Sequence, residues 1–245
     1  MRPKPFINYF LTTFFFVVFA PTAMILDSCN AGNENSKNSI SVTSTKTTGK
    51  IAEEPSSPFE DMVSTLESND RVIWQKPELV MTLLGDNLNE KTVADIGAGS
   101  GYFSFRILPM AKKVIGIEID RRFISFMDSL KVRQPNYLQN RFEARLAQPD
   151  NPRLKDAEAD AVLVVNTYSY IENRVAYMSN LLKGMSKGAK LLIIDFKKKN
   201  IPIGPPQEVK LDDRQVSEEL RKAGFRTILV DDKTLDYQYI VTALK

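Results

Sequence analysis

Residues 93–103 read Val-Ala-Asp-Ile-Gly-Ala-Gly-Ser-Gly-Tyr-Phe, so an apolar run is followed at once by three closely spaced glycines. Glycine permits a tight turn and lets a ligand approach the backbone, and the start of a following helix offers unpaired N–H groups. The spacing is G-x-G-x-G, with Tyr102 where the third glycine of the dinucleotide fingerprint G-x-G-x-x-G would stand. The stretch predicts a ligand-binding turn between a strand and a helix.

Strand and helix patterns alternate on both sides of this turn. Continuous apolar strands that alternate with helices predict a mostly parallel sheet covered on both faces. We therefore expect a Rossmann-like, doubly wound α/β fold with seven strands, the last one antiparallel, whose ligands bind beyond the carboxyl ends of the strands. The expected strands are 92–96, 113–119, 141–146, 161–165, 190–196, 227–230 and 237–244. The expected helices are two within 59–85, the second beginning at Pro77, and one each at 102–110, 121–131, 174–185 and 216–223.

A carboxylate at the end of the second strand supports the same site independently. One expected helix and one expected strand separate Gly101 from Glu118. Glu118 therefore ends the second strand, and in a parallel sheet this places it at the same edge as the glycines. A carboxylate there can accept hydrogen bonds from both hydroxyls of a ribose. Asp95 precedes the glycine turn by two positions.

These features together resemble motif I of class I S-adenosylmethionine-dependent methyltransferases. The likeness covers roughly residues 70–245 and points to a bacterial group akin to the ubiquinone/menaquinone-biosynthesis methyltransferases. The segments that carry it are Arg71-x-x-Trp74-x-x-Pro77, 150–154 with 160–163, 165–168, 171–174, 204–206 and 223–225.

The resemblance implies S-adenosylmethionine as cofactor and a small-molecule or lipid-like methyl acceptor. It assigns the cofactor to Asp95, Gly97, Gly99, Gly101, Glu118 and Asp150, the last of these beside the adenine. Candidates for the substrate pocket are Asn166, Tyr168 and Tyr170, and no catalytic residue is assigned. Two alternatives stay open: an inactive, exported or membrane-tethered module that retains the cofactor pocket, and a nicotinamide-dependent oxidoreductase, which the glycine spacing disfavours.

The amino-acid composition limits which catalytic groups, metal sites and partners can be expected. The chain has no histidine and a single cysteine, so the commonest general base is missing and no cysteine- or histidine-based metal site is expected. A net charge of +3 gives no reason to expect a nucleic-acid partner. Methyl transfer from a sulfonium gains mainly from alignment of the reacting atoms, so it needs no histidine.

The first part of the chain has the pattern of an export signal. Arg2 and Lys4 precede a mostly apolar stretch, 6–26, which ends in Leu26-Asp27-Ser28-Cys29. This resembles a bacterial lipoprotein signal, in which Cys29 would be lipidated and the protein would attach to a membrane and face the periplasm. The alternative is an uncleaved N-terminal anchor. We expect a signal at 1–29, a polar linker at 30–57 and the methyltransferase domain at 58–245.

Overall fold

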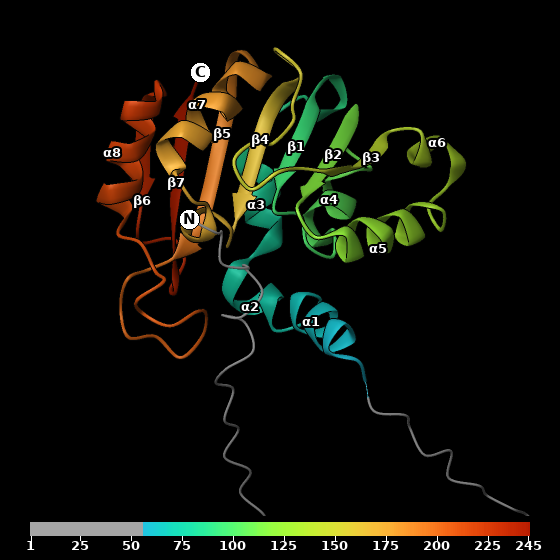
Figure 1. The fold of residues 1–245 in the computed structure, drawn as a ribbon, viewed down its shortest axis with the longest axis horizontal. Coiled ribbons are helices and arrows are strands. Elements are labelled where there is room, and N and C mark those ends of the chain that lie inside the picture. Colours follow the sequence, from blue (N-terminus) through green and yellow to red (C-terminus); the bar gives the residue numbers. More distant parts are fainter. Residues whose placement is uncertain (1–55) are drawn as a thin grey trace, which may run out of the picture. The chain divides into compact units, whose positions relative to one another are not determined.

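A computed structural model describes residues 56–245 (Figure 1). The signal predicted at 1–29, with Cys29, and nearly all of the linker predicted at 30–57 lie outside the described residues, so these assignments remain predictions.

Seven strands form one twisted sheet with the order β3-β2-β1-β4-β5-β7-β6 (Figure 1). Strands β1 to β5 are parallel to one another, whereas β7 runs antiparallel to both of its neighbours, β5 and β6. The predicted fold class is confirmed, including the antiparallel last strand. The strands are β1 (Thr92–Ile96), β2 (Lys113–Glu118), β3 (Phe142–Leu146), β4 (Ala159–Val165), β5 (Met185–Phe196), β6 (Arg226–Asp231) and β7 (Gln238–Leu244).

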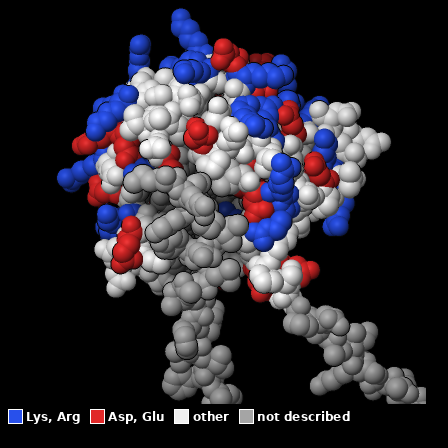
Figure 2. Space-filling model, viewed as in Figure 1, with Lys and Arg blue, Asp and Glu red and all other residues white. Residues whose placement is uncertain are grey.

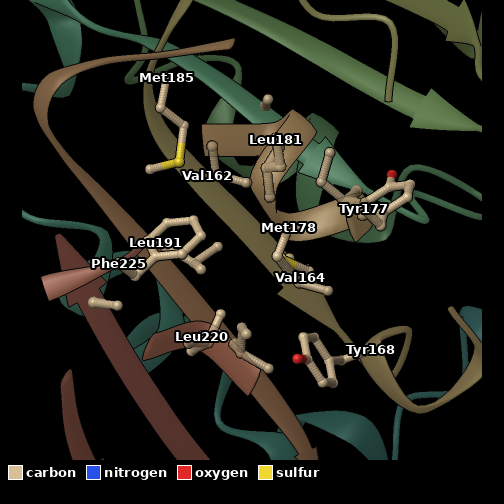
Figure 3. Packing of buried hydrophobic residues seen from close by; sticks show 14 of the residues in the cluster. Val162, Val164, Tyr168, Tyr177, Met178, Leu181, Met185, Leu191, Leu220 and Phe225 are labelled. Atoms are coloured by element: carbon tan, nitrogen blue, oxygen red, sulfur yellow. The ribbon is translucent and has the colours of Figure 1, made fainter. Parts of the chain in front are cut away.

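Helices cover both faces of the sheet. Buried side chains of α7 and α8 pack against one face, where Met178, Leu181 and Leu220 meet apolar side chains of β4 and β5 (Figure 3). Those of α3, α4 and α5 pack against the other face. The helices are α1 (Pro58–Leu66), α2 (Arg71–Gln75), α3 (Pro77–Leu84), η2 (Leu88–Glu90), α4 (Tyr102–Ile107), α5 (Arg121–Lys131), α6 (Asn136–Gln139), η3 (Tyr168–Tyr170), α7 (Arg174–Gly184) and α8 (Asp213–Ala223). Within residues 56–245, the helices are too short or too polar for any of them to cross a membrane.

The segment before β1 differs from the prediction, because it forms three helices rather than two. Pro77 begins α3 as expected. Lys76, just before it, adopts a left-handed conformation with φ 49° and separates α2 from α3, as a residue before proline disfavours the right-handed helix.

Strand β5 begins earlier than predicted, at Met185. Its pairing with β4 shifts register between Met185 and Lys190, and the exposed residues Lys187 and Gly188 occupy this irregular part. A bulge of this kind interrupts the alternation of side chains, so the early part of the strand has no apolar pattern.

Candidate functional site

The glycine turn lies at the carboxyl end of β1, and all three of its glycines have left-handed backbones, with φ of 69°, 54° and 84° at Gly97, Gly99 and Gly101. A Cβ atom on Gly97 would lie 2.3 Å from the Thr167 hydroxyl oxygen, and one on Gly101 would lie 2.7 Å from the Phe105 ring. The packing of the chain itself therefore excludes side chains at these two positions. Gly99 is different, since the nearest atom to its Cβ position is a methyl group of Leu66 at 3.1 Å.

Glu118 ends β2 and is hydrogen-bonded to the turn. Its Oε2 accepts a hydrogen bond from the Gly99 amide at 3.0 Å, and its Oε1 accepts from the amides of Ile119 at 2.7 Å and Asp120 at 3.3 Å. Burial raises the pKa of Glu118. A carboxylate offers about four acceptor positions, so one position on Oε2 is left for a ligand hydroxyl. A second hydroxyl would have to compete with a backbone amide for an acceptor position that is already occupied.

Asp95 lies beneath the turn and supports it. It is 3% exposed, and its Oδ2 accepts a hydrogen bond from the Ser104 hydroxyl of α4 at 2.7 Å. Burial raises its pKa to about 6, although the Ser104 bond lowers it in part. The side chain therefore braces the strand against the helix, and the structure does not place it at the surface of the crevice.

The segment after β4 brings together some of the predicted pocket residues but not all. Asn166 is half-buried directly after the strand, and Tyr170 is half-buried at the end of η3. Burial and the nearby carboxylate of Asp195 raise the pKa of Tyr170 to about 12. Tyr168 is fully buried in the core (Figure 3). Its hydroxyl donates a hydrogen bond to Glu219 of α8 at 2.9 Å. A pocket role for Tyr168 does not fit this position, because its ring faces the α7 and α8 layer.

Asp195 holds the same segment from β5. Its two carboxylate oxygens accept hydrogen bonds from the backbone amides of Phe196 at 2.8 Å and Ser169 at 3.2 Å. It is 2% exposed, and burial raises its pKa to about 6. The sequence predicts a supporting acid at this position, where Asp195 ends the fifth strand, and these two hydrogen bonds agree with that role.

The raised pKa values of Asp95 and Asp195 predict how stability depends on pH. Both rise from an ordinary 3.8 to about 6 on folding, so the folded protein holds protons that the unfolded chain releases. The resulting stabilisation is complete below the unfolded pKa and is lost as the pH rises through about 6. We expect these two carboxyl groups to lower the free energy of unfolding by urea between about pH 4 and about pH 6, so that it changes less with pH in Asp95→Asn than in the wild type. Equal slopes in the two proteins would contradict a raised pKa for Asp95.

Asp150 lies in the loop between β3 and β4, where it is exposed. The loop turns back at a bridge between Gln148 and Asn151. The structure therefore places Asp150 near the carboxyl end of β3, two strands away from the glycine turn.

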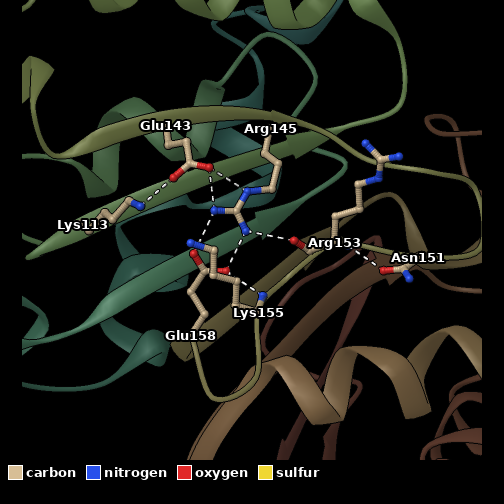
Figure 4. Close-up of polar contacts among 7 residues, drawn as sticks. All are labelled: Lys113, Glu143, Arg145, Asn151, Arg153, Lys155 and Glu158. Carbon is tan, nitrogen blue, oxygen red and sulfur yellow. Dashed lines mark hydrogen bonds and ion pairs between the residues drawn. The ribbon is translucent and has the colours of Figure 1, made fainter.

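Arg145 of β3 fixes the second half of this loop (Figure 4). Its guanidinium group donates two hydrogen bonds to Glu158 at 2.6 and 2.8 Å and one to the Arg153 carbonyl at 3.1 Å. It also donates to Glu143 at 2.7 Å. The pKa of Glu158 falls to about 2, chiefly through its hydrogen bond to Arg145. The sequence pattern assigns no role to Arg145, although an arginine inside an expected parallel strand is a visible signal.

The Arg71-x-x-Trp74-x-x-Pro77 segment, which precedes β1 in the sequence, packs next to the glycine turn and the end of β5. The Arg71 guanidinium lies 3.8 Å from the centre of the Tyr102 ring and donates a hydrogen bond to the Leu66 carbonyl. The Trp74 ring lies 5.6 Å from the ring of Phe196 at the end of β5. Leu66 and Trp74 are thus both held at the carboxyl ends of the strands.

Charged side chains of both signs are interspersed over the described part of the face shown in Figure 2. Among residues 56–245, no cluster of carboxylate side chains could hold a metal ion.

The residues at the carboxyl ends of β1, β2 and β4 suit an adenosyl cofactor with an amino-acid tail. Gly99 has no side chain to obstruct a ligand, Glu118 keeps an acceptor position for a hydroxyl, and Asn166 is half-buried beside the turn. Such an arrangement can orient a bound ligand.

Comparisons with known proteins agree with this geometry. Residues 94–191 match a family model described as a methyltransferase domain. No curated protein matches the chain.

Three solved structures share the fold. An S-adenosylmethionine-dependent methyltransferase from Aquifex aeolicus is 22% identical, with a TM-score of 0.67 over 75% of this chain and 97% of that one. A phosphoethanolamine N-methyltransferase from Haemonchus contortus, in complex with S-adenosylhomocysteine, is 12% identical, with a TM-score of 0.58 over 78% and 60%. A protein from Bordetella parapertussis described as a possible exported protein is 14% identical, with a TM-score of 0.57 over 81% and 76%.

These identities carry the fold alone, whereas the family model covers β1 to the middle of β5, with the glycine turn and Glu118. Residues 94–191 therefore match a methyltransferase domain, and the chain shares the fold of solved S-adenosylmethionine-dependent methyltransferases.

Proposed function

We propose that this protein transfers the methyl group of S-adenosylmethionine to a small, lipid-like acceptor, as a member of a group akin to the ubiquinone/menaquinone-biosynthesis methyltransferases. The observation that carries the proposal is the hydrogen bond between the Gly99 amide and Glu118, which joins the two sequence features predicted to hold the cofactor. Gly97, Gly99, Gly101 and Glu118 would hold the adenosyl group and the tail, with Asp95 supporting the turn.

The main task of the protein in this reaction would be to align the acceptor atom with the methyl group of the cofactor. The bound cofactor supplies an electrophilic methyl group on a sulfonium. Glu118 and the glycine turn would fix the position of the cofactor, and residues after β4 and β5 would hold the acceptor in line with the methyl group. No side chain has to act as general base when the acceptor atom is already nucleophilic.

The side chains at the carboxyl end of β5 favour an apolar acceptor. Trp74 packs against Phe196, and a Cβ on Gly204 would lie 2.7 Å from the same Phe196 ring, so the loop after β5 packs closely over it. Tyr170 is near Asp195, which precedes Phe196. Phe196 is itself buried, so the half-buried rings of Trp74 and Tyr170 would be the ones to contact the apolar part of a ligand.

Methyl transfer into a membrane extract tests the proposal. The full-length protein, incubated with S-adenosylmethionine carrying a labelled methyl group, should label material that partitions into organic solvent. Label found only in the aqueous phase would contradict a lipid-like acceptor. Cofactor binding without any turnover would instead favour the inactive module.

For the N-terminal segment we propose lipidation of Cys29, supported by the pattern Leu26-Asp27-Ser28-Cys29 after an apolar stretch. Growth of the producing bacterium with a clickable fatty acid should label the wild-type protein and not Cys29→Ala. Equal labelling of both proteins, or of neither, would contradict the proposal and favour an uncleaved anchor.

A further inference from the structure

A chain of buried hydrogen bonds runs from α2 to the end of β4. Arg71 Nε donates to Gln75 Oε1 at 2.8 Å, and Gln75 Nε2 donates to Gln238 Oε1 at 3.4 Å. Gln238 Nε2 then donates to Asn166 Oδ1 at 2.5 Å. Gln75 and Gln238 are both fully buried, so their amides have no water to satisfy them and depend on one another.

Arg71 decides which end of each following amide donates and which accepts. A guanidinium group can only donate hydrogen bonds, whereas an amide has one donating and one accepting end. Because Arg71 takes the oxygen of Gln75, the nitrogen of Gln75 must face Gln238, and the nitrogen of Gln238 must in turn face Asn166. The oxygen of Asn166 is then used, and its Nδ2 donates no hydrogen bond to any residue between 56 and 245.

Asn166 stands next to the glycine turn. Its backbone N–H donates to the Ile194 carbonyl at 2.9 Å, and its left-handed backbone, with φ 54°, turns the chain out of β4. The following residue, Thr167, lies against Gly97, with its hydroxyl 3.5 Å from the Gly97 carbonyl. This is the side of the turn away from Glu118, because β4 and β2 flank β1 on opposite sides.

We propose that Arg71, Gln75 and Gln238 are positioning residues that orient the Asn166 amide, so that its Nδ2 is offered to the carboxylate of the cofactor's amino-acid tail. This rests on the proposed cofactor site, with the ribose at Glu118 and the tail at the opposite side of the turn. A donor at this position would bind a carboxylate, whereas the reversed amide would repel it.

A substitution that reverses the donor and acceptor at Gln238 tests the proposal. In Gln238→Glu, residue 238 can only accept hydrogen bonds once its carboxylate is ionised, so binding is measured from about pH 7 to about pH 9, because burial raises the pKa of a glutamate. It still accepts from Gln75, but Asn166 must rotate and donate to it, which leaves Oδ1 facing the ligand. Gln238→Met removes the partner of Asn166 without adding charge, and keeps the test available if the glutamate variant does not fold.

Two ligands separate the tail from the rest of the cofactor. S-adenosylhomocysteine carries the amino-acid carboxylate, and methylthioadenosine has the same adenosine without it. We expect Gln238→Glu in the full-length protein to weaken calorimetric binding of S-adenosylhomocysteine roughly ten- to a hundredfold, with methylthioadenosine nearly unchanged. Gln238→Met should show a smaller loss with the same selectivity.

Asn166→Ala supplies the control. Since the amide to be oriented is then absent, adding Gln238→Glu to it should change the ratio of the two affinities no further. Equal losses for both ligands, or the same extra loss in the Asn166→Ala background, would overturn the positioning role. Failure of the wild-type protein to bind either ligand would instead overturn the cofactor site itself.

Discussion

Replacement of Gly99 by valine is expected to abolish binding of S-adenosylhomocysteine, the largest loss expected for any single substitution in the site. Gly99 has φ 54°, a conformation that a β-branched residue strongly disfavours. Its Cβ would lie 3.1 Å from Leu66, and the two methyl groups of valine would fill the space through which the ligand approaches the Gly99 backbone. Titration calorimetry of the full-length variant measures the effect.

Gly188→Val is the matched control for backbone strain. Gly188 also has a positive φ, 75°, but nothing lies within 4 Å of its Cβ position, and it sits in the irregular part of β5 at the amino-terminal side of the strand. We expect this variant to lose some stability and to keep its cofactor affinity. If Gly99→Val folds and binds as tightly as Gly188→Val does, the ligand does not approach Gly99.

Glu118→Gln is expected to weaken cofactor binding roughly ten- to a hundredfold, because a charge-assisted hydrogen bond to the ribose is worth about 1.5–3 kcal/mol. From the sequence alone, this change is expected to leave the fold intact. The structure shows a further cost, since Glu118 accepts hydrogen bonds from three backbone amides, including that of Gly99. A glutamine must turn its own NH₂ group toward one of these N–H groups, so we expect some loss of stability as well.

A cofactor analogue with 2′-deoxyribose distinguishes the two effects. It should bind more weakly than the parent to the wild-type protein and should lose little more in Glu118→Gln, because the shared interaction is already gone. Glu143→Gln, in the neighbouring strand β3, replaces a glutamate paired with Lys113 at 2.6 Å and should leave the affinity for both ligands unchanged. Simple addition of the two losses would show that Glu118 does not contact the ribose.

The sequence predicted the elements whose patterns are local. Apolar runs indicated most of the strands, whereas β3, with Glu143 and Arg145, has no such run. Helix α5 runs from Arg121 to Lys131 as predicted. The glycine turn and Glu118 could also be predicted, because each follows a strand directly. One helix and one strand set the distance in sequence between them. Their hydrogen bond at 3.0 Å follows from the parallel pairing of β1 and β2.

The features that the sequence did not predict depend on contacts between distant parts of the chain. Gln75 and Gln238 are separated by 163 positions, and no periodicity in either segment shows that they meet. Tyr168 matched the pattern of a pocket residue after a strand, yet η3 turns its ring into the core, where Glu219 of α8 accepts its hydroxyl hydrogen bond. Which of several aromatic residues near a strand end faces the ligand is decided by such packing and cannot be read from local spacing.

Titration of the full-length protein with S-adenosylhomocysteine, S-adenosylmethionine and NADH is the most direct test of the central claim. We expect both adenosyl ligands to bind with one site per chain, and NADH to show no heat of binding, because the third glycine of the dinucleotide fingerprint is replaced by Tyr102. Binding of NADH without binding of either adenosyl ligand would contradict the account.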